Sequence, residues 1–108
     1  MKKKPGSDRE AYRRQAEICK AFANPTRLHV IDLLSRGGRW SSELQAGVGI
    51  SKANLSQHLS ILKSAGVVST HREGKQLRCG LSMPAVKRAT ALLRSMMNSQ
   101  QRRTRRRR

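Results

Sequence analysis

Apolar residues recur at helical spacing along the first third of the chain and predict two helices. Ser7 and Glu10 have the spacing of a capping box, so the first helix is expected over residues 8–23. Asn24-Pro25 ends this helix and begins the next at once, because proline fits the first helical position behind an asparagine cap. Gly37-Gly38 stop the second helix. Its expected core stripe consists of Leu28, Ile31 and Leu34.

Two more helices are predicted before residue 65. A short helix is capped by Ser41 or Ser42 and ends within the Gly-Val-Gly run at residues 47–49, since glycine disfavours a helix interior. A longer helix is capped by Ser51, spans about residues 52–64 and reverses at Gly66. Three leucines give it one narrow apolar face: Leu55, Leu59 and Leu62.

Alternation typical of strands follows, over about residues 67–81. The turn at residues 72–75 separates a first run from a second in which Leu77, Cys79 and Leu81 alternate with more polar positions, so we expect a two-stranded hairpin. Met83-Pro84 starts a last helix that is expected to end near residue 98. The predicted fold is mainly α with a small β-hairpin wing, in the order α-α-α-α-β-β-α.

The charge of the chain is strongly positive. Its 108 residues suffice for one domain, expected over residues 8–98, and a hydrophobic fraction of 36% with three aromatic residues makes a thin core that favours a second subunit. The net charge is +18, and nine excess charges remain without the basic arm at residues 1–7 and the Arg-rich tail at residues 99–108. Both tails are expected to be disordered. A basic body with basic tails favours nucleic acid as the partner.

The sequence also bears on location. No stretch approaches the roughly 18 apolar residues that a membrane span needs, and no apolar segment follows the basic N-terminus as it would in a secretory signal. Two cysteines, Cys19 and Cys79, do not make a disulfide framework. We therefore expect a cytoplasmic protein without a membrane partner, associated with the nucleoid.

The helices at about residues 42–64 are joined by a short glycine-containing turn, which is typical of a helix-turn-helix. Opposite its leucines, the second helix of this pair carries small or neutral hydrogen-bonding side chains and no carboxylate. Such a face suits the major groove of double-stranded DNA, where an amide such as Gln57 pairs with adenine. The candidate recognition residues are Ser51, Lys52, Ala53, Asn54, Ser56, Gln57, His58 and Ser60.

The hairpin at about residues 67–81 follows this helix directly and has a basic tip. A hairpin in this position is a wing that reaches the minor groove or the phosphates. Its candidate contact residues are His71, Arg72, Lys75 and Arg78.

Three segments resemble, in the right order, motifs of the ArsR/SmtB family of winged helix-turn-helix repressors. They are ANPTRLHVIDLL at residues 23–34, ISKANLSQHLSILKSAGVV at 50–68 and REGK at 72–75. The resemblance covers about residues 14–82. It implies a homodimer joined through the helices at about 8–23 and 84–98, repression at a palindromic operator, and release by an effector. By matching positions it also implies DNA contact by Lys52, Asn54, Ser56, Gln57, His58, Arg72 and Lys75.

The effector is where the sequence departs from the family. Residues 40–42 read Trp-Ser-Ser where the thiolate sensors of the family have Cys-Val-Cys, and residues 84–101 contain no His, Cys, Asp or Glu. Neither metal site of the family is therefore present, and no metal or cofactor is predicted. Cys19 and Cys79 are candidate thiol sensors, although both also read as small buried apolar residues. The effector is non-metal, thiol-based or absent.

Other classes of function fit the sequence less well. An enzyme is not expected, because no carboxylate pair, nucleophile with base, or phosphate-cradling glycine loop is found. The main alternative is a non-specific architectural DNA- or RNA-binding protein driven by the basic tails. A partner-binding module that has kept the fold and lost DNA binding is a third reading.

Overall fold

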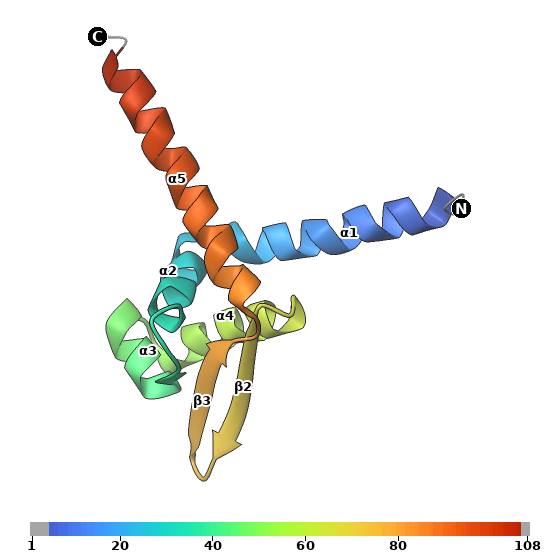
Figure 1. Ribbon diagram of the computed structural model, residues 1–108. Coiled ribbons are helices and arrows are strands. Elements are labelled where there is room, and N and C mark those ends of the chain that lie inside the picture. The colour runs from blue at the N-terminus through green and yellow to red at the C-terminus, as the bar shows by residue number, and fades with distance from the viewer. Residues whose placement is uncertain (1–4, 107–108) are drawn as a thin grey trace.

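The computed structural model describes residues 5–106. These residues form five helices and a small sheet, arranged as in Figure 1. The predicted order is confirmed with one addition, a short strand before the third helix. In chain order the elements are α1 (Pro5–Phe22), α2 (Pro25–Leu34), β1 (Arg39–Trp40), α3 (Ser41–Val48), α4 (Lys52–Ser64), β2 (Val68–Glu73), β3 (Gln76–Leu81) and α5 (Pro84–Arg106).

The junction between α1 and α2 forms as the sequence predicts. Asn24 is the N-cap of α2, its side-chain oxygen accepts a hydrogen bond from the Arg27 backbone N–H at 3.1 Å, and Pro25 occupies the first helical position. The cap satisfies one of the backbone N–H groups that a helix start leaves without a partner.

The core lies where α2, α3, α4 and the sheet meet. The predicted leucine face of α4 is buried, whereas Leu28 of α2 is 38% exposed and Val30 is buried in its place. Five of the seven positions from 28 to 34 are apolar, so the pattern alone did not determine which face of α2 turns inward. The buried apolar residues are Ala21, Val30, Ile31, Leu34, Leu44, Leu55, Leu59, Leu62, Val67, Val68, Cys79 and Val86.

The sheet has three antiparallel strands in the order β1-β3-β2. The predicted hairpin forms β2 and β3, and β1 was not predicted because two residues carry no recognisable alternation. In the observed register Arg78 lies opposite both Trp40 and His71. Its guanidinium carbon lies 5.0 Å from the centroid of the Trp40 ring, a cation–π contact that holds β1 against β3.

Helices α1 and α5 are longer than predicted. Helix α1 begins at Pro5 instead of behind Ser7, and α5 continues to Arg106 instead of ending near residue 98. The expected disorder is therefore wrong for residues 5–7 and 99–106, while residues 1–4 and 107–108 of the predicted tails lie outside the described residues. The continuation of α5 agrees with its composition, because glutamine and arginine are good helix formers and cations near a helix C-terminus interact favourably with the helix dipole.

Both long helices project from the body of the molecule (Figure 1). Helix α1 runs to one side, and α5 runs away from the hairpin tip. Over the described residues, no helix combines the length and apolar character needed to cross a membrane.

Candidate nucleic-acid interface

The turn between α3 and α4 is built by two residues with defined roles. Gly49 adopts φ +78° at the end of α3, and its N–H donates to the Gln45 carbonyl at 2.9 Å. Ser51 caps α4, its hydroxyl oxygen accepting from the Asn54 N–H at 3.1 Å.

The predicted serine cap of α3 is wrong, because Trp40 is the N-cap and its N–H donates to the Glu43 carboxylate at 3.0 Å.

The end of α4 follows its predicted form. Gly66 has φ +76°, its N–H donates to the Lys63 carbonyl at 3.0 Å, and the Val67 N–H donates to the Leu62 carbonyl at 2.9 Å. This pair of bonds is a Schellman motif, which reverses the chain directly into β2. The wing is therefore held close behind α4.

The face of α4 opposite the buried leucines is exposed and has no carboxylate. Amides and hydroxyls on this face can both donate and accept hydrogen bonds, as base edges in a major groove require. The exposed members of the predicted set are Ser51, Lys52, Ala53, Asn54, Ser56, Gln57 and Ser60.

His58 differs from the other predicted residues on α4. It is half-buried, and its Nδ1 atom lies 3.3 Å from Nη1 of Arg27 in α2. The helical pattern placed His58 on the flank of the recognition face but could not find Arg27, because the two residues are 31 positions apart in the sequence.

The predicted wing residues separate into two groups. Arg72 and Lys75 are exposed beside the turn at Gly74, which has φ +63°. His71 is exposed but its Nε2 lies 2.8 Å from the Glu73 carboxylate, and Arg78 is half-buried over Trp40. The exposed cations at the tip therefore suit phosphate contact, and the other two side chains are already engaged within the sheet.

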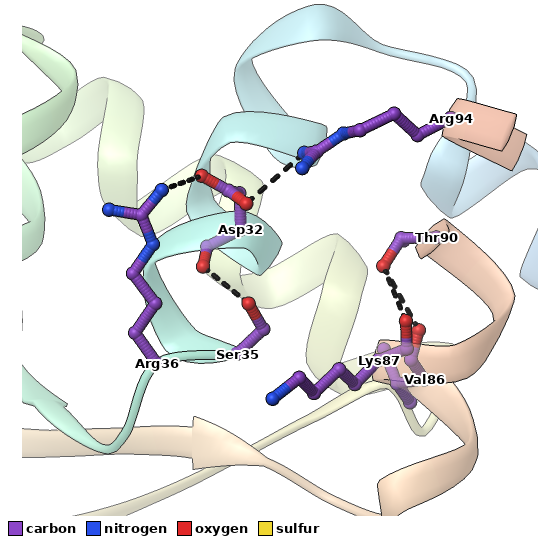
Figure 2. Close-up of polar contacts among 7 residues, drawn as sticks. All are labelled: Asp32, Ser35, Arg36, Val86, Lys87, Thr90 and Arg94. Atoms are coloured by element: carbon purple, nitrogen blue, oxygen red, sulfur yellow. Dashed lines mark hydrogen bonds and ion pairs between the residues drawn. The ribbon is translucent and has the colours of Figure 1, made fainter. Parts of the chain in front are cut away.

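An ion-pair group that the sequence analysis missed joins α5 to α2 (Figure 2). Asp32 accepts from Arg36 at 3.2 Å and from Arg94 at 3.1 Å. The Ser35 hydroxyl donates to the Asp32 carbonyl at 2.6 Å. The spacing of Asp32 and Arg36 is a recognisable i,i+4 pair, but nothing local points to Arg94. In the same view, the Thr90 hydroxyl donates to carbonyls of the preceding turn of α5.

The two cysteines lie in different environments. Cys79 is buried as predicted, and burial raises the pKa of its thiol above the usual range, with the nearby Arg78 charge opposing this effect. Cys19 is exposed, so the reading of Cys19 as a buried residue is wrong for the single chain. Cys19 lies on the apolar face of α1, and this helix projects from the body of its own chain (Figure 1). Among the described residues, no group of three or more His, Cys, Asp or Glu side chains gathers in a way that could hold a metal ion.

Large apolar side chains are exposed on α1 and α5. Leu92 and Met96 are each 67% exposed, and they lie one turn apart on the same side of α5. A single chain leaves this surface in water, which is unusual for apolar residues in contiguous rows. The exposed apolar residues of the two helices are Tyr12, Ile18, Leu92, Leu93, Met96 and Met97.

The α3–turn–α4 unit, with the hairpin directly behind it, defines a winged helix-turn-helix protein. Comparison with known proteins agrees with this class. Residues 24–70 match the model of the bacterial regulatory protein, arsR family. The chain belongs to the ArsR family of bacterial regulatory proteins.

Two relatives show how far the sequence similarity extends. The transcriptional regulator Rv0081 of Mycobacterium tuberculosis is 33% identical over 80% of this chain and 76% of its own length. The probable mercury resistance operon repressor of Streptomyces lividans is 42% identical over 66% of this chain, and the matched part spans 57% of that repressor.

A solved structure extends the likeness to the whole fold. The homodimeric winged helix-turn-helix DNA-binding domain of Mb0332 from Mycobacterium bovis has a TM-score of 0.84 and is 28% identical, with 93% of each chain covered.

Proposed function

We propose that this protein is a homodimeric transcriptional repressor that reads a palindromic operator with α4 and contacts the flanking DNA with its wing. The observation that carries the proposal is the exposed, carboxylate-free polar face of α4, fixed from behind by three buried leucines. The basic tip of the adjacent hairpin supports it, because phosphate contacts orient a reading helix in the groove.

The exposed apolar row of α5 supports the homodimer, together with the exposed Tyr12 and Ile18 of α1. Burying a leucine or methionine side chain contributes about 1.5–3 kcal/mol, so a second copy covering the α5 row gains substantial free energy. The related Mb0332 domain is itself described as homodimeric. A two-fold symmetric dimer presents its recognition helices to two half-sites, which makes a palindromic operator the matching target.

We propose that release from DNA is controlled by a non-metal effector or by a thiol of the protein, or that no effector controls it. Of the two thiols, exposed Cys19 is accessible to an oxidant in the single chain, and buried Cys79 is not. We propose that the protein acts by binding and not by catalysis. Its place of action would be the DNA of the nucleoid, in the cytoplasm.

The experiment that tests the proposal is selection from a random duplex DNA library at near-physiological salt. The full chain is compared with a chain lacking residues 102–108 and with the Gln57→Ala variant. Enrichment of a two-fold symmetric motif that survives loss of the tail supports a sequence-specific dimer. A motif that changes in Gln57→Ala ties sequence reading to α4.

The alternative is a non-specific architectural DNA- or RNA-binding protein. The positively charged end of α5, where Arg102 and Arg103 are exposed, favours it. This reading takes first place if no motif is enriched at a salt concentration where binding persists. It also requires that loss of residues 102–108 abolish most of the binding.

A further inference from the structure

Arg27 lies in the first turn of α2, and its side chain contacts two other helices. Its backbone N–H donates to the Asn24 cap. Its side-chain Nε donates to the Ala21 carbonyl at 2.8 Å, and Nη2 donates to the Lys20 carbonyl at 3.0 Å. Carbonyls in the last turn of a helix have no helical partner, and a cation there is favoured by the helix dipole. Arg27 therefore caps the end of α1.

The remaining guanidinium nitrogen reaches α4. Nη1 of Arg27 lies 3.3 Å from Nδ1 of His58. A guanidinium has donors only, so Nδ1 must be the acceptor, and a neutral imidazole with a bare Nδ1 carries its proton on Nε2. No described residue is hydrogen-bonded to this Nε2 atom. The contact thus leaves His58 with one N–H donor that is not used within the described chain.

We propose that Arg27 is a positioning residue for the recognition helix. It holds His58 in the Nε2–H form, so that the ring offers a hydrogen-bond donor to an acceptor on duplex DNA. It also fixes the position of α4 relative to the end of α1. Suitable acceptors are base edges in the major groove, namely O6 or N7 of guanine and O4 of thymine. The inference rests on the proposed function, because it needs α4 to bind DNA.

The link to α1 gives the contact a second consequence. In the proposed dimer α1 belongs to the interface, so the Arg27 side chain joins the interface helix to the reading helix through 2.8–3.3 Å contacts. Half-sites one helical turn apart require the two reading helices to keep a fixed separation. A residue that ties each α4 to its own α1 restricts changes in that separation.

The first test measures the tautomer of His58 in the full chain without DNA. Nitrogen–proton NMR of the imidazole distinguishes the two neutral forms. We expect the Nε2–H form in the native protein, a mixture of forms in Arg27→Met, and no change in Arg36→Met, which removes an arginine that lies just beyond α2 and pairs with Asp32. An Nδ1–H ring in the native protein, or an unchanged tautomer in Arg27→Met, overturns the inference.

The second test measures affinity for the selected operator and for an unrelated duplex. His58→Asn keeps an acceptor near the Nδ1 position but loses the outer donor. His58→Gln keeps a donor further out but loses the acceptor for Arg27. We expect Arg27→Met, His58→Asn and His58→Gln each to lose about tenfold in operator affinity, as for a hydrogen bond to a charged group. Affinity for the unrelated duplex should stay within about twofold.

The outcomes separate this inference from the function on which it rests. Losses in Arg27→Met and His58→Gln that add fully in the double variant contradict a shared contact. Unchanged operator affinity in either single variant also overturns the inference. If Arg27→Met fails to fold, the operator affinity of His58→Gln tests the inference, because this variant leaves the bonds from Arg27 to α1 in place. A native protein that selects no operator refutes the proposed function, whereas the tautomer measurement still stands.

Discussion

Arg94 of α5 donates to Oδ1 of Asp32 in α2 at 3.1 Å, and the two residues are 62 positions apart in the sequence. The second carboxylate oxygen of Asp32 accepts from Arg36 at 3.2 Å (Figure 2). The Asp32 side chain is only 26% exposed, so this carboxylate is better shielded from solvent than either arginine. It fixes α5, which projects from the body, against the unit that carries the reading helix.

Replacing Asp32 should loosen this connection. We expect Asp32→Asn to lower the free energy of unfolding by about 1 kcal/mol, because two ion pairs are lost at a partly shielded site. Arg36→Met removes only the i,i+4 pair and should cost about 0.3–0.5 kcal/mol. Urea unfolding at low and high salt measures both, and the effect of Asp32→Asn should shrink as salt screens the pairs. Equal losses in the free energy of unfolding of the two variants would show that the pair between Arg94 and Asp32 contributes nothing to stability.

The parts of the fold that were predicted depend on local signals. Asn24-Pro25, Ser51 and Gly66 each satisfy backbone groups within a few residues of themselves, so their roles can be read from the sequence alone. The leucines of α4 face the core because their spacing permits only one buried face. The exposed polar residues of α4 follow from the same geometry.

The parts that were missed depend on contacts between distant segments or on a second chain. β1 is a two-residue strand that exists because Trp40 lies opposite Arg78, and Arg27 meets His58 only after α2 and α4 pack together. Cys19 was read as buried because α1 is amphipathic, but a single chain provides no surface to cover that face. Periodicity shows that a face is apolar without showing what covers it.

Burial of Cys79 makes stability depend on pH. Burial raises the pKa of this thiol in the folded protein above its ordinary value of 9.0. The unfolded chain therefore releases the proton first, and the free energy of unfolding should fall as the pH rises above about 9, by at most about 1.4 kcal/mol per pH unit. Chemical denaturation at several pH values measures this slope.

Variants of the two cysteines give matched controls for this slope. Cys79→Ala lowers stability at every pH by leaving a small void, but it should abolish this part of the pH dependence. Cys19→Ala should retain it, because Cys19 is exposed. A slope that persists in Cys79→Ala would have to come from other groups.

Gln57 and Lys75 should affect DNA binding in different ways. Gln57→Ala removes an amide suited to a base edge, so we expect a loss of about 1–3 kcal/mol for the selected operator and relaxed preference at one base pair of each half-site. Lys75→Met removes a cation at the wing tip. It should weaken binding to all duplexes alike and reduce the salt slope by about one unit. Fluorescence anisotropy across a salt series distinguishes the two patterns, and a uniform loss in Gln57→Ala would argue against base reading by α4.

The exposed row on α5 predicts where dimer formation can be broken. Met96→Glu places a charge in the middle of the apolar row, so the dimer should dissociate at micromolar concentration while the folded chain persists, since Met96 is 67% exposed in the single chain. Asn98→Asp is the matched control, because the helical wheel puts Asn98 opposite the row. Sedimentation reports the mass, and circular dichroism reports helix content. An unchanged dimer in Met96→Glu would move the interface away from α5.

The arginine-rich end of α5 should strengthen binding without choosing the sequence. Six of the residues from 102 to 108 are arginines, and Arg102 and Arg103 are exposed on the helix. A guanidinium that neutralises one phosphate steepens the salt dependence by about 0.9 units. Deleting residues 102–108 should therefore weaken binding to the operator and to an unrelated duplex by the same factor and flatten both salt slopes equally. If the deletion weakened only operator binding, or changed the selected motif, the tail would take part in sequence recognition and α4 would not act alone.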